Sequence, residues 1–137
     1  GCGNGVIGLI AAARNPQAEL IFIDESFMAV ASARENFQAA MPARKVSFAV
    51  ADGLENADEN SSDLILCNPP FHQQRAVDDA TARRMFHQAR AALKKGGELW
   101  IVGNRHLGYH ARLKRLFNSC ETIASNRKFV VLRSVKR

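Results

Sequence analysis

Residues 1–24 read GCGNGVIGLIAAARNPQAELIFID, a glycine-rich turn followed by a helical run and then by a short apolar strand. Gly3, Gly5 and Gly8 satisfy the spacing G-x-G-x-x-G, in which glycine permits a tight turn and lets backbone amides approach a ligand. Asp24 ends the strand about where an acid that holds a ribose is expected. Nicotinamide dinucleotides and S-adenosylmethionine both carry an adenosine ribose, so this stretch fits either cofactor, and a purely structural turn stays open.

Apolar strands and amphipathic helices alternate outward from this turn. The patterns predict helices over about 5–13, 26–41 and 109–117, and a further helix with an apolar stripe at Ala82, Met85, Phe86, Ala89 and Leu93 that Gly96-Gly97 ends. They predict strands over 19–24, 46–50, 63–67, 98–102, 121–124 and 129–135. The last two strands have no helix between them, so they should be antiparallel. The sequence therefore predicts an α/β fold with a mostly parallel sheet and one antiparallel strand in a C-terminal hairpin.

The length of 137 residues predicts one domain, residues 1–137. A glycine turn of this kind normally follows a strand, which lies at the centre of a doubly wound sheet. We therefore expect the first, central strand to be missing from this chain and the domain to be truncated at its N-terminus.

Charge is distributed unevenly along the chain. Residues 1–70 hold four basic and nine acidic side chains, whereas residues 71–137 hold fifteen basic and four acidic ones. Clustered lysine and arginine neutralise phosphates, so the second half predicts a nucleic-acid contact, with a solvated basic surface as the alternative. The candidate contacts are His72, Asn104, Arg105, Arg127 and Lys128; His72 either touches RNA or caps its loop.

Apolar runs of only a few residues predict no membrane span, which needs about 20. No basic-then-apolar leader is visible, and the three cysteines form no C-x-x-C pair, so a reducing cytoplasm is expected. His106 and His110 have helical spacing but no third ligand, and no metal site is predicted. Cys67 is expected to be a small buried strand residue rather than a covalent nucleophile.

Asn68-Pro69-Pro70-Phe71 directly follows the predicted strand 63–67. The two prolines remove two backbone N–H donors and fix the chain direction. The Asn68 side-chain oxygen and the Pro69 carbonyl can then accept hydrogen bonds from one planar NH₂ group, while Phe71 stacks on the ring that bears it. Methylation of an exocyclic amine needs such acceptors, and a base must leave its stack to reach them. The motif therefore predicts an amino-methyltransferase site; a proline-stiffened loop is the alternative.

Four segments together resemble class I S-adenosylmethionine-dependent methyltransferases over the whole chain: GCGNGVIGL, FIDES, VADG and NPPF. The longer segments LCNPPFHQQ, GELWIVGNRHL and NRKFVVL are similar to the bacterial large-subunit ribosomal RNA guanine-N2 methyltransferases (RlmG type), whose sisters act on the small subunit (RsmC type). The resemblance implies a Rossmann-like fold, S-adenosylmethionine as cofactor, and methyl transfer to N2 of a guanine in large-subunit (23S) ribosomal RNA. The resemblance also implies an N-terminal methyltransferase-like domain, which we expect to be absent from this chain.

The resemblance also implies roles for single residues. The glycine turn would line the methionine part of the cofactor, Asp24 with Glu25 the ribose, and Asp52 with Gly53 the adenine. The implied cofactor residues are Gly1, Gly3, Asn4, Gly5, Asp24, Glu25, Asp52, Gly53 and Asn68, and the implied catalytic residues are Asn68, Pro69, Pro70 and Phe71.

Four other functions stay open at this point. A small-subunit guanine-N2 enzyme and an N6-adenine or protein-glutamine methyltransferase would use related motifs. A non-catalytic RNA-binding module would need neither the glycine turn nor NPPF. An NAD oxidoreductase would have no use for the amine site.

Overall fold

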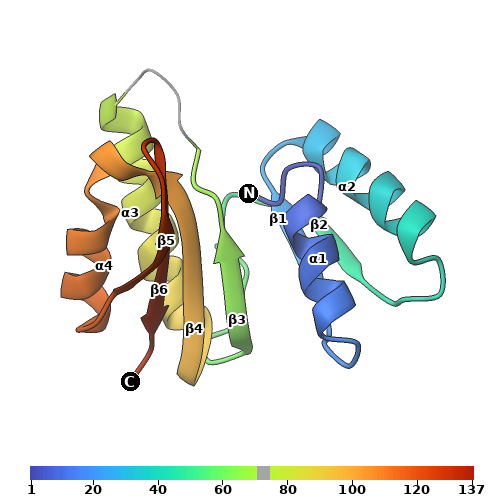
Figure 1. Ribbon diagram of the computed structural model, residues 1–137. Coiled ribbons are helices and arrows are strands. Elements are labelled where there is room, and N and C mark those ends of the chain that lie inside the picture. The colour runs from blue at the N-terminus through green and yellow to red at the C-terminus, as the bar shows by residue number, and fades with distance from the viewer. Residues whose placement is uncertain (71–74) are drawn as a thin grey trace. The chain divides into compact units, whose positions relative to one another are not determined.

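The computed structural model describes residues 1–70 and 75–137. They form two compact units, residues 1–55 and residues 56–137 (Figure 1). Each unit combines helices with its own sheet.

The first unit pairs two parallel strands with two helices: α1 (Val6–Arg14), β1 (Ile21–Asp24), α2 (Phe27–Ala40) and β2 (Ser47–Val50). Ser26 begins α2, because its side-chain oxygen accepts a hydrogen bond of 3.2 Å from the Ala29 amide. Three aromatic rings meet edge to face in the core, with centroids 5.4 Å apart for Phe22 and Phe37 and 5.2 Å apart for Phe22 and Phe48. The predicted helices and strands of this half are therefore present.

The second unit has a four-stranded sheet in the order β3-β4-β6-β5. Its elements are β3 (Ser62–Cys67), α3 (Arg75–Ala92), β4 (Leu93–Asn104), the short 3₁₀ helix η1 (Arg105–Leu107), α4 (Tyr109–Phe117), β5 (Glu121–Ser125) and β6 (Phe129–Val135). β3 and β4 are parallel, and β6 is antiparallel to both β4 and β5. The predicted C-terminal hairpin with one reversed strand is confirmed.

Helices α3 and α4 pack together on one face of this sheet (Figure 1). The rings of Phe86 on α3 and Tyr109 on α4 meet edge to face with centroids 5.1 Å apart. Tyr109 also lies against β4, where a Cβ added to Gly103 would be 2.7 Å from the tyrosine ring. A glycine near the end of β4 therefore lets α4 pack closely on the strand.

The end of the third helix was predicted wrongly. The helix stops at Ala92 rather than at Gly96-Gly97, and β4 already begins at Leu93, which is fully buried and pairs with Ser62. The glycines bond to the chain beyond β6: Gly96 donates to the Lys136 carbonyl at 2.6 Å, and the Lys136 amide donates to Gly97 at 2.9 Å. These long-range hydrogen bonds extend the strand across the glycines.

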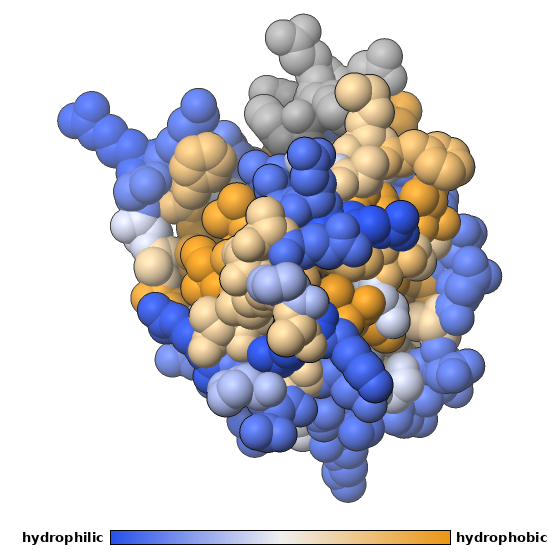
Figure 2. Space-filling view, turned by 90° about the vertical axis from the view of Figure 1, so that its right-hand side faces the viewer, coloured by the Kyte–Doolittle hydropathy of each residue, from blue (hydrophilic) through white to orange (hydrophobic). Residues whose placement is uncertain are grey.

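Apolar and hydrophilic side chains are interspersed on the face presented in Figure 2. Phe27 and Met28, at the start of α2, are among the exposed apolar residues, at 79% and 84% exposure. None of the described helices is both long enough and apolar enough to cross a membrane.

Candidate functional site

The glycine turn before α1 is built on backbone angles that favour glycine. Gly3 has φ of +55° and Gly5 has φ of +87°, and the Gly5 amide closes the turn on the Cys2 carbonyl at 3.0 Å. A Cβ on Gly5 would lie 3.0 Å from Ala33 Cβ of α2, whereas a Cβ on Gly3 would meet nothing within 4 Å. Gly5 therefore allows the turn to pack closely against α2, and Gly3 leaves open space beside the turn.

Asp24 connects this turn to the start of α2 through its two carboxylate oxygens. The Gly3 amide donates to Oδ2 at 3.0 Å, and the Ser26 amide donates to Oδ1 at 3.0 Å. Each oxygen keeps a second lone pair for a further donor, and the side chain is 14% exposed. Asp24 can thus hold the turn and still accept a hydrogen bond from a ligand hydroxyl, while Glu25 beside it is exposed.

The other residues predicted for the cofactor in this unit lie at the same end of its sheet. The Ala51 amide donates to the Asp24 carbonyl at 3.0 Å, which brings the turn at Asp52 and Gly53 next to the end of β1. Gly53 has φ of +62°, and the Asp52 amide donates to Glu55 Oε1 at 3.2 Å. Gly1 donates to the Ile23 carbonyl at 2.8 Å. The first unit therefore gathers its predicted cofactor residues at the carboxyl ends of two parallel strands, where open α/β sheets bind ligands.

One residue that supports the turn, Asn36 on α2, was not predicted from the sequence. Asn36 on α2 donates to the Asn4 carbonyl at 2.9 Å, and Asn4 Oδ1 in turn accepts from the Val6 amide at 3.3 Å. A Cβ on Gly8 would lie 2.3 Å from the Phe22 ring, so this glycine lets α1 pack on β1. Gly8 belongs to the quoted glycine pattern. Nothing in the sequence distinguishes Asn36 from the other polar residues of α2.

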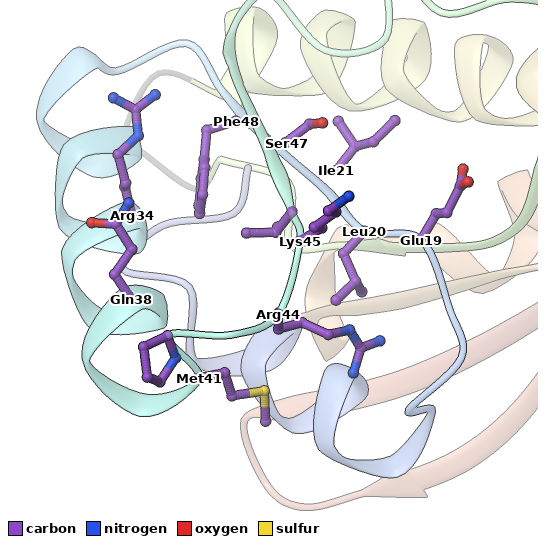
Figure 3. Close-up of a pocket in the computed structure, with 12 residues that line it drawn as sticks. Glu19, Leu20, Ile21, Arg34, Gln38, Met41, Arg44, Lys45, Ser47 and Phe48 are labelled. Atoms are coloured by element: carbon purple, nitrogen blue, oxygen red, sulfur yellow. The ribbon is translucent and has the colours of Figure 1, made fainter.

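The groove drawn in Figure 3 lies at the opposite end of the first unit's sheet. It has a volume of about 820 Å³ and is lined by the segments that begin β1 and β2. Arg44 points from it towards the end of α1, where its guanidinium donates to the carbonyls of Ala12, Asn15 and Ala18. This groove is therefore separate from the predicted cofactor residues. Arg44 binds carbonyls at and beyond the C-terminal end of α1.

In the second unit, Asn68 follows the last residue of β3. Its side chain is exposed and makes no hydrogen bond within the described part of the chain, so its oxygen is available to a donor. Pro69 is buried and Pro70 half-buried, which fixes the backbone beyond Asn68. Phe71 and His72 lie outside the described residues.

Cys67, directly before this motif, has a thiol whose pKa is raised to about 11 by burial. The thiol is protonated at neutral pH, and the thiolate is the nucleophilic form. This agrees with the sequence interpretation of Cys67 as a structural residue.

The carboxyl end of β4 carries two of the predicted RNA contacts. Asn104 Oδ1 accepts from the His106 amide at 3.0 Å and so caps η1. The Arg105 amide donates to the Lys128 carbonyl at 3.0 Å, which ties η1 to the tip of the β5–β6 hairpin. The structure therefore brings Asn104, Arg105 and Lys128 together at one edge of this sheet.

Comparison with known proteins identifies the family. The family model of the methyltransferase small domain matches residues 1–133. The chain belongs to the methyltransferase small domain family. Among its curated relatives, ribosomal RNA large subunit methyltransferase G of Stutzerimonas stutzeri is 62% identical over 99% of the chain, and that of Streptomyces griseus is 60% identical over the whole chain. In both cases the chain covers 36% of the relative, about a third of its length.

Solved structures of other proteins share the fold of this methyltransferase small domain. The Thermus thermophilus 16S rRNA N2 G1207 methyltransferase, in complex with AdoMet and guanosine, matches with a TM-score of 0.84 and 27% identity, over 100% of the chain and 36% of that protein. The ribosomal protein L11 methylase of Lactobacillus delbrueckii shares the fold at 19% identity, with a TM-score of 0.74 over 100% of the chain and 67% of that protein. The predicted Rossmann-like class I methyltransferase fold is confirmed.

Proposed function

We propose that this domain transfers a methyl group from S-adenosylmethionine to N2 of a guanine in large-subunit (23S) ribosomal RNA. Asn68 carries the proposal, because it follows a parallel strand, precedes two prolines, and has a side-chain amide with no hydrogen-bond partner among the described residues. The 62% identity to enzymes named for the large ribosomal subunit supports the RNA substrate. The neighbour named for N2 of a guanosine supports the position. We also propose a cytoplasmic location, because that is where a bacterial ribosomal RNA would be met.

The glycine turn of the first unit suits the cofactor. A side chain at Gly3 would fill space that is open beside the turn, and Asp24 retains lone pairs for ribose hydroxyls. In the proposed assignment Gly1 to Gly5 border the methionine part, Asp24 and Glu25 the ribose, and Asp52 with Gly53 the adenine. S-adenosylmethionine supplies a methyl group that its sulfonium already activates, so the protein's main task is alignment.

The amine site of the second unit then has one chemical task. The guanine N2 lone pair is delocalised into the base. Hydrogen bonds from the two amine protons to Asn68 Oδ1 and the Pro69 carbonyl would turn this lone pair out of the delocalised system. The nitrogen would then accept the methyl group that the cofactor supplies, the cofactor would leave as the neutral thioether, and the surplus amine proton would pass to water. Phe71 is proposed to stack on the base and His72 to contact the RNA beside it.

The experiment uses the full-length protein, methyl-labelled S-adenosylmethionine and ribosomal RNA that lacks the modification. The RNA is digested and the labelled nucleoside is identified. We expect N2-methylguanosine from large-subunit RNA. Labelled N6-methyladenosine, a labelled protein, or label confined to small-subunit RNA would overturn the proposed substrate.

The variant Asn68→Ala tests the site. We expect turnover to fall by about 10²-fold, as when one positioned hydrogen-bond partner is removed from a reacting group, with little change in cofactor affinity. Asn56→Ala is the matched control, because Asn56 is exposed in the loop before β3. Lost cofactor binding with intact turnover per bound enzyme would contradict the role of Asn68.

A further inference from the structure

The tip of the β5–β6 hairpin, residues 126–128, lies at the same sheet edge as the amine motif. In the antiparallel register Phe129 pairs with Asn104, so the hairpin tip adjoins the carboxyl end of β4 (Figure 1). In the parallel register Cys67 pairs with Ile101, so Asn68 leaves β3 at that edge as well. Neighbouring strands lie about 4.8 Å apart. The hairpin strand β6 is therefore about 10 Å from β3, the span of a few stacked nucleotides.

The tip is held in one conformation by local hydrogen bonds. Asn126 Oδ1 accepts from the Lys128 amide at 2.9 Å and from the Phe129 amide at 2.7 Å. Arg105 fixes the tip from outside, since its Nη1 donates to the Asn126 carbonyl at 3.0 Å and its own amide donates to the Lys128 carbonyl at 3.0 Å. The hairpin tip is thus anchored to η1, directly after β4.

Several cations of this unit are held by acidic partners, whereas the cations of the tip are not paired with any described acid. Arg133 is paired with Glu98 and Glu121, and Arg112 is paired with Asp79. Arg127 and Lys128 are exposed and form no ion pair with any described residue. Both side chains are therefore available to a ligand.

An aromatic ring stands beside these free cations. Phe129 is 45% exposed, and Lys128 Nζ lies 5.5 Å from the centre of its ring. Cations combined with an exposed aromatic ring are the two elements with which proteins bind single-stranded nucleic acid: phosphates meet the charges and a base stacks on the ring.

We propose that Arg127, Lys128 and Phe129 form an RNA-docking surface that holds nucleotides flanking the target base. This inference rests on the proposed function and extends it from the reacting base to its neighbours. Arg127 and Lys128 neutralise backbone phosphates, Phe129 stacks on an unpaired base, and Arg105 is a positioning residue that fixes the tip. The surface raises affinity for the RNA without touching the reacting amine.

The test compares two double variants of the full-length protein that lose the same charge. Arg127→Gln/Lys128→Gln alters the tip; Lys95→Gln/Arg137→Gln removes two exposed cations at the opposite end of β4 and β6. The dissociation constant for an unmodified ribosomal RNA fragment is measured at several salt concentrations, together with kcat and KM. For the tip variant we expect binding about tenfold weaker, a salt slope lower by about 1.4 for two lost phosphate contacts, a raised KM and an unchanged kcat. The opposite-end variant should keep the original slope.

Phe129→Ala separates stacking from charge. We expect RNA binding to weaken by about tenfold with no change in the salt slope. Equal slopes in the two double variants, or unaltered binding in Phe129→Ala, would overturn the docking surface. RNA binding is measured without methyl transfer, so an unaltered protein that binds RNA but labels none contradicts the proposed function and leaves this test intact.

Discussion

The backbone amide of Gly3 donates a hydrogen bond of 3.0 Å to Asp24 Oδ2, across 21 residues of sequence. The second carboxylate oxygen of Asp24 accepts from the Ser26 amide at 3.0 Å, where the chain turns into α2. One side chain therefore connects the glycine turn, the end of β1 and the start of α2. The shape of the turn therefore depends on the same carboxylate that we propose to bind the ribose.

Asp24→Asn should weaken cofactor binding. Asparagine keeps one acceptor oxygen and replaces the other with an NH₂ group, which cannot accept from a backbone amide. Hydrogen bonds to charged groups contribute about 1.5–3 kcal/mol, so we expect the dissociation constant for S-adenosylmethionine to rise at least tenfold in calorimetric titration of the full-length protein.

Glu35→Gln provides the control for this titration, because Glu35 is an exposed carboxylate on α2. It removes the same charge without touching the turn, and we expect cofactor affinity within about twofold of the original. Similar losses in Asp24→Asn and Glu35→Gln would show that only net charge matters.

Gly8→Ala should destabilise the protein through packing. The added Cβ would lie 2.3 Å from the Phe22 ring, which is 4% exposed and cannot move away without disturbing the core. Overpacking of this kind costs about 1–3 kcal/mol, measured as the free energy of unfolding in urea. Ala13→Ser, at an exposed position of the same helix, should change it by less than about 0.5 kcal/mol. Equal effects of the two substitutions would contradict the packing role of Gly8.

Local patterns predicted most of the elements. The helix at 109–117 and the strand at 129–135 were predicted with their observed bounds, because glycine and short polar turns flank both. The end of α3 was wrong, since Gly96 and Gly97 are held in β4 by hydrogen bonds to Lys136, about forty residues further along the chain. Glycine after a helical pattern is a local signal for the end of a helix, and it does not predict hydrogen bonds to a residue far along the chain.

The candidate site likewise contains some features that the local sequence predicts and others that it does not. The glycine pattern and the acid at the end of β1 are local features, and the structure joins them as Gly3 and Asp24. The tether from Asn36 to Asn4 is a contact between a helix and a distant loop, and its asparagine resembles any exposed polar residue of α2. The roles of Asn68 and of the cofactor residues stay predictions until the variants are measured.

Cys67→Ala should retain methyl transfer. Burial raises the thiol pKa to about 11, so almost no thiolate exists at neutral pH and the residue cannot serve as a nucleophile. We expect kcat within about twofold of the original and slow alkylation of Cys67 below pH 9, followed by mass spectrometry of the modified peptide. Complete loss of transfer in a folded Cys67→Ala variant would indicate covalent catalysis instead.

The stability of the four-stranded sheet of the second unit should depend on pH through Glu98. Arg133 on β6 bonds to Glu98 on β4 and lies 3.1 Å from Glu121 Oε2 on β5, so one guanidinium joins three strands. The hydrogen bond from Arg133 lowers the pKa of Glu98 below its ordinary value of 4.5. A lowered pKa in the folded state stabilises the protein above the ordinary pKa, and this stabilisation is lost as the pH falls through the folded value.

Glu98→Gln should therefore lower the unfolding midpoint in urea at pH 7, and the difference from the original protein should shrink as the pH falls below 4.5. Both side chains are about one-third exposed, at 29% for Glu98 and 34% for Arg133, so solvent screening keeps the effect small. Glu59→Gln, an exposed carboxylate in the loop before β3, is the control and should show no such convergence. A midpoint difference that stays constant from pH 7 to pH 3 would mean that the glutamate acts by packing rather than by its charge.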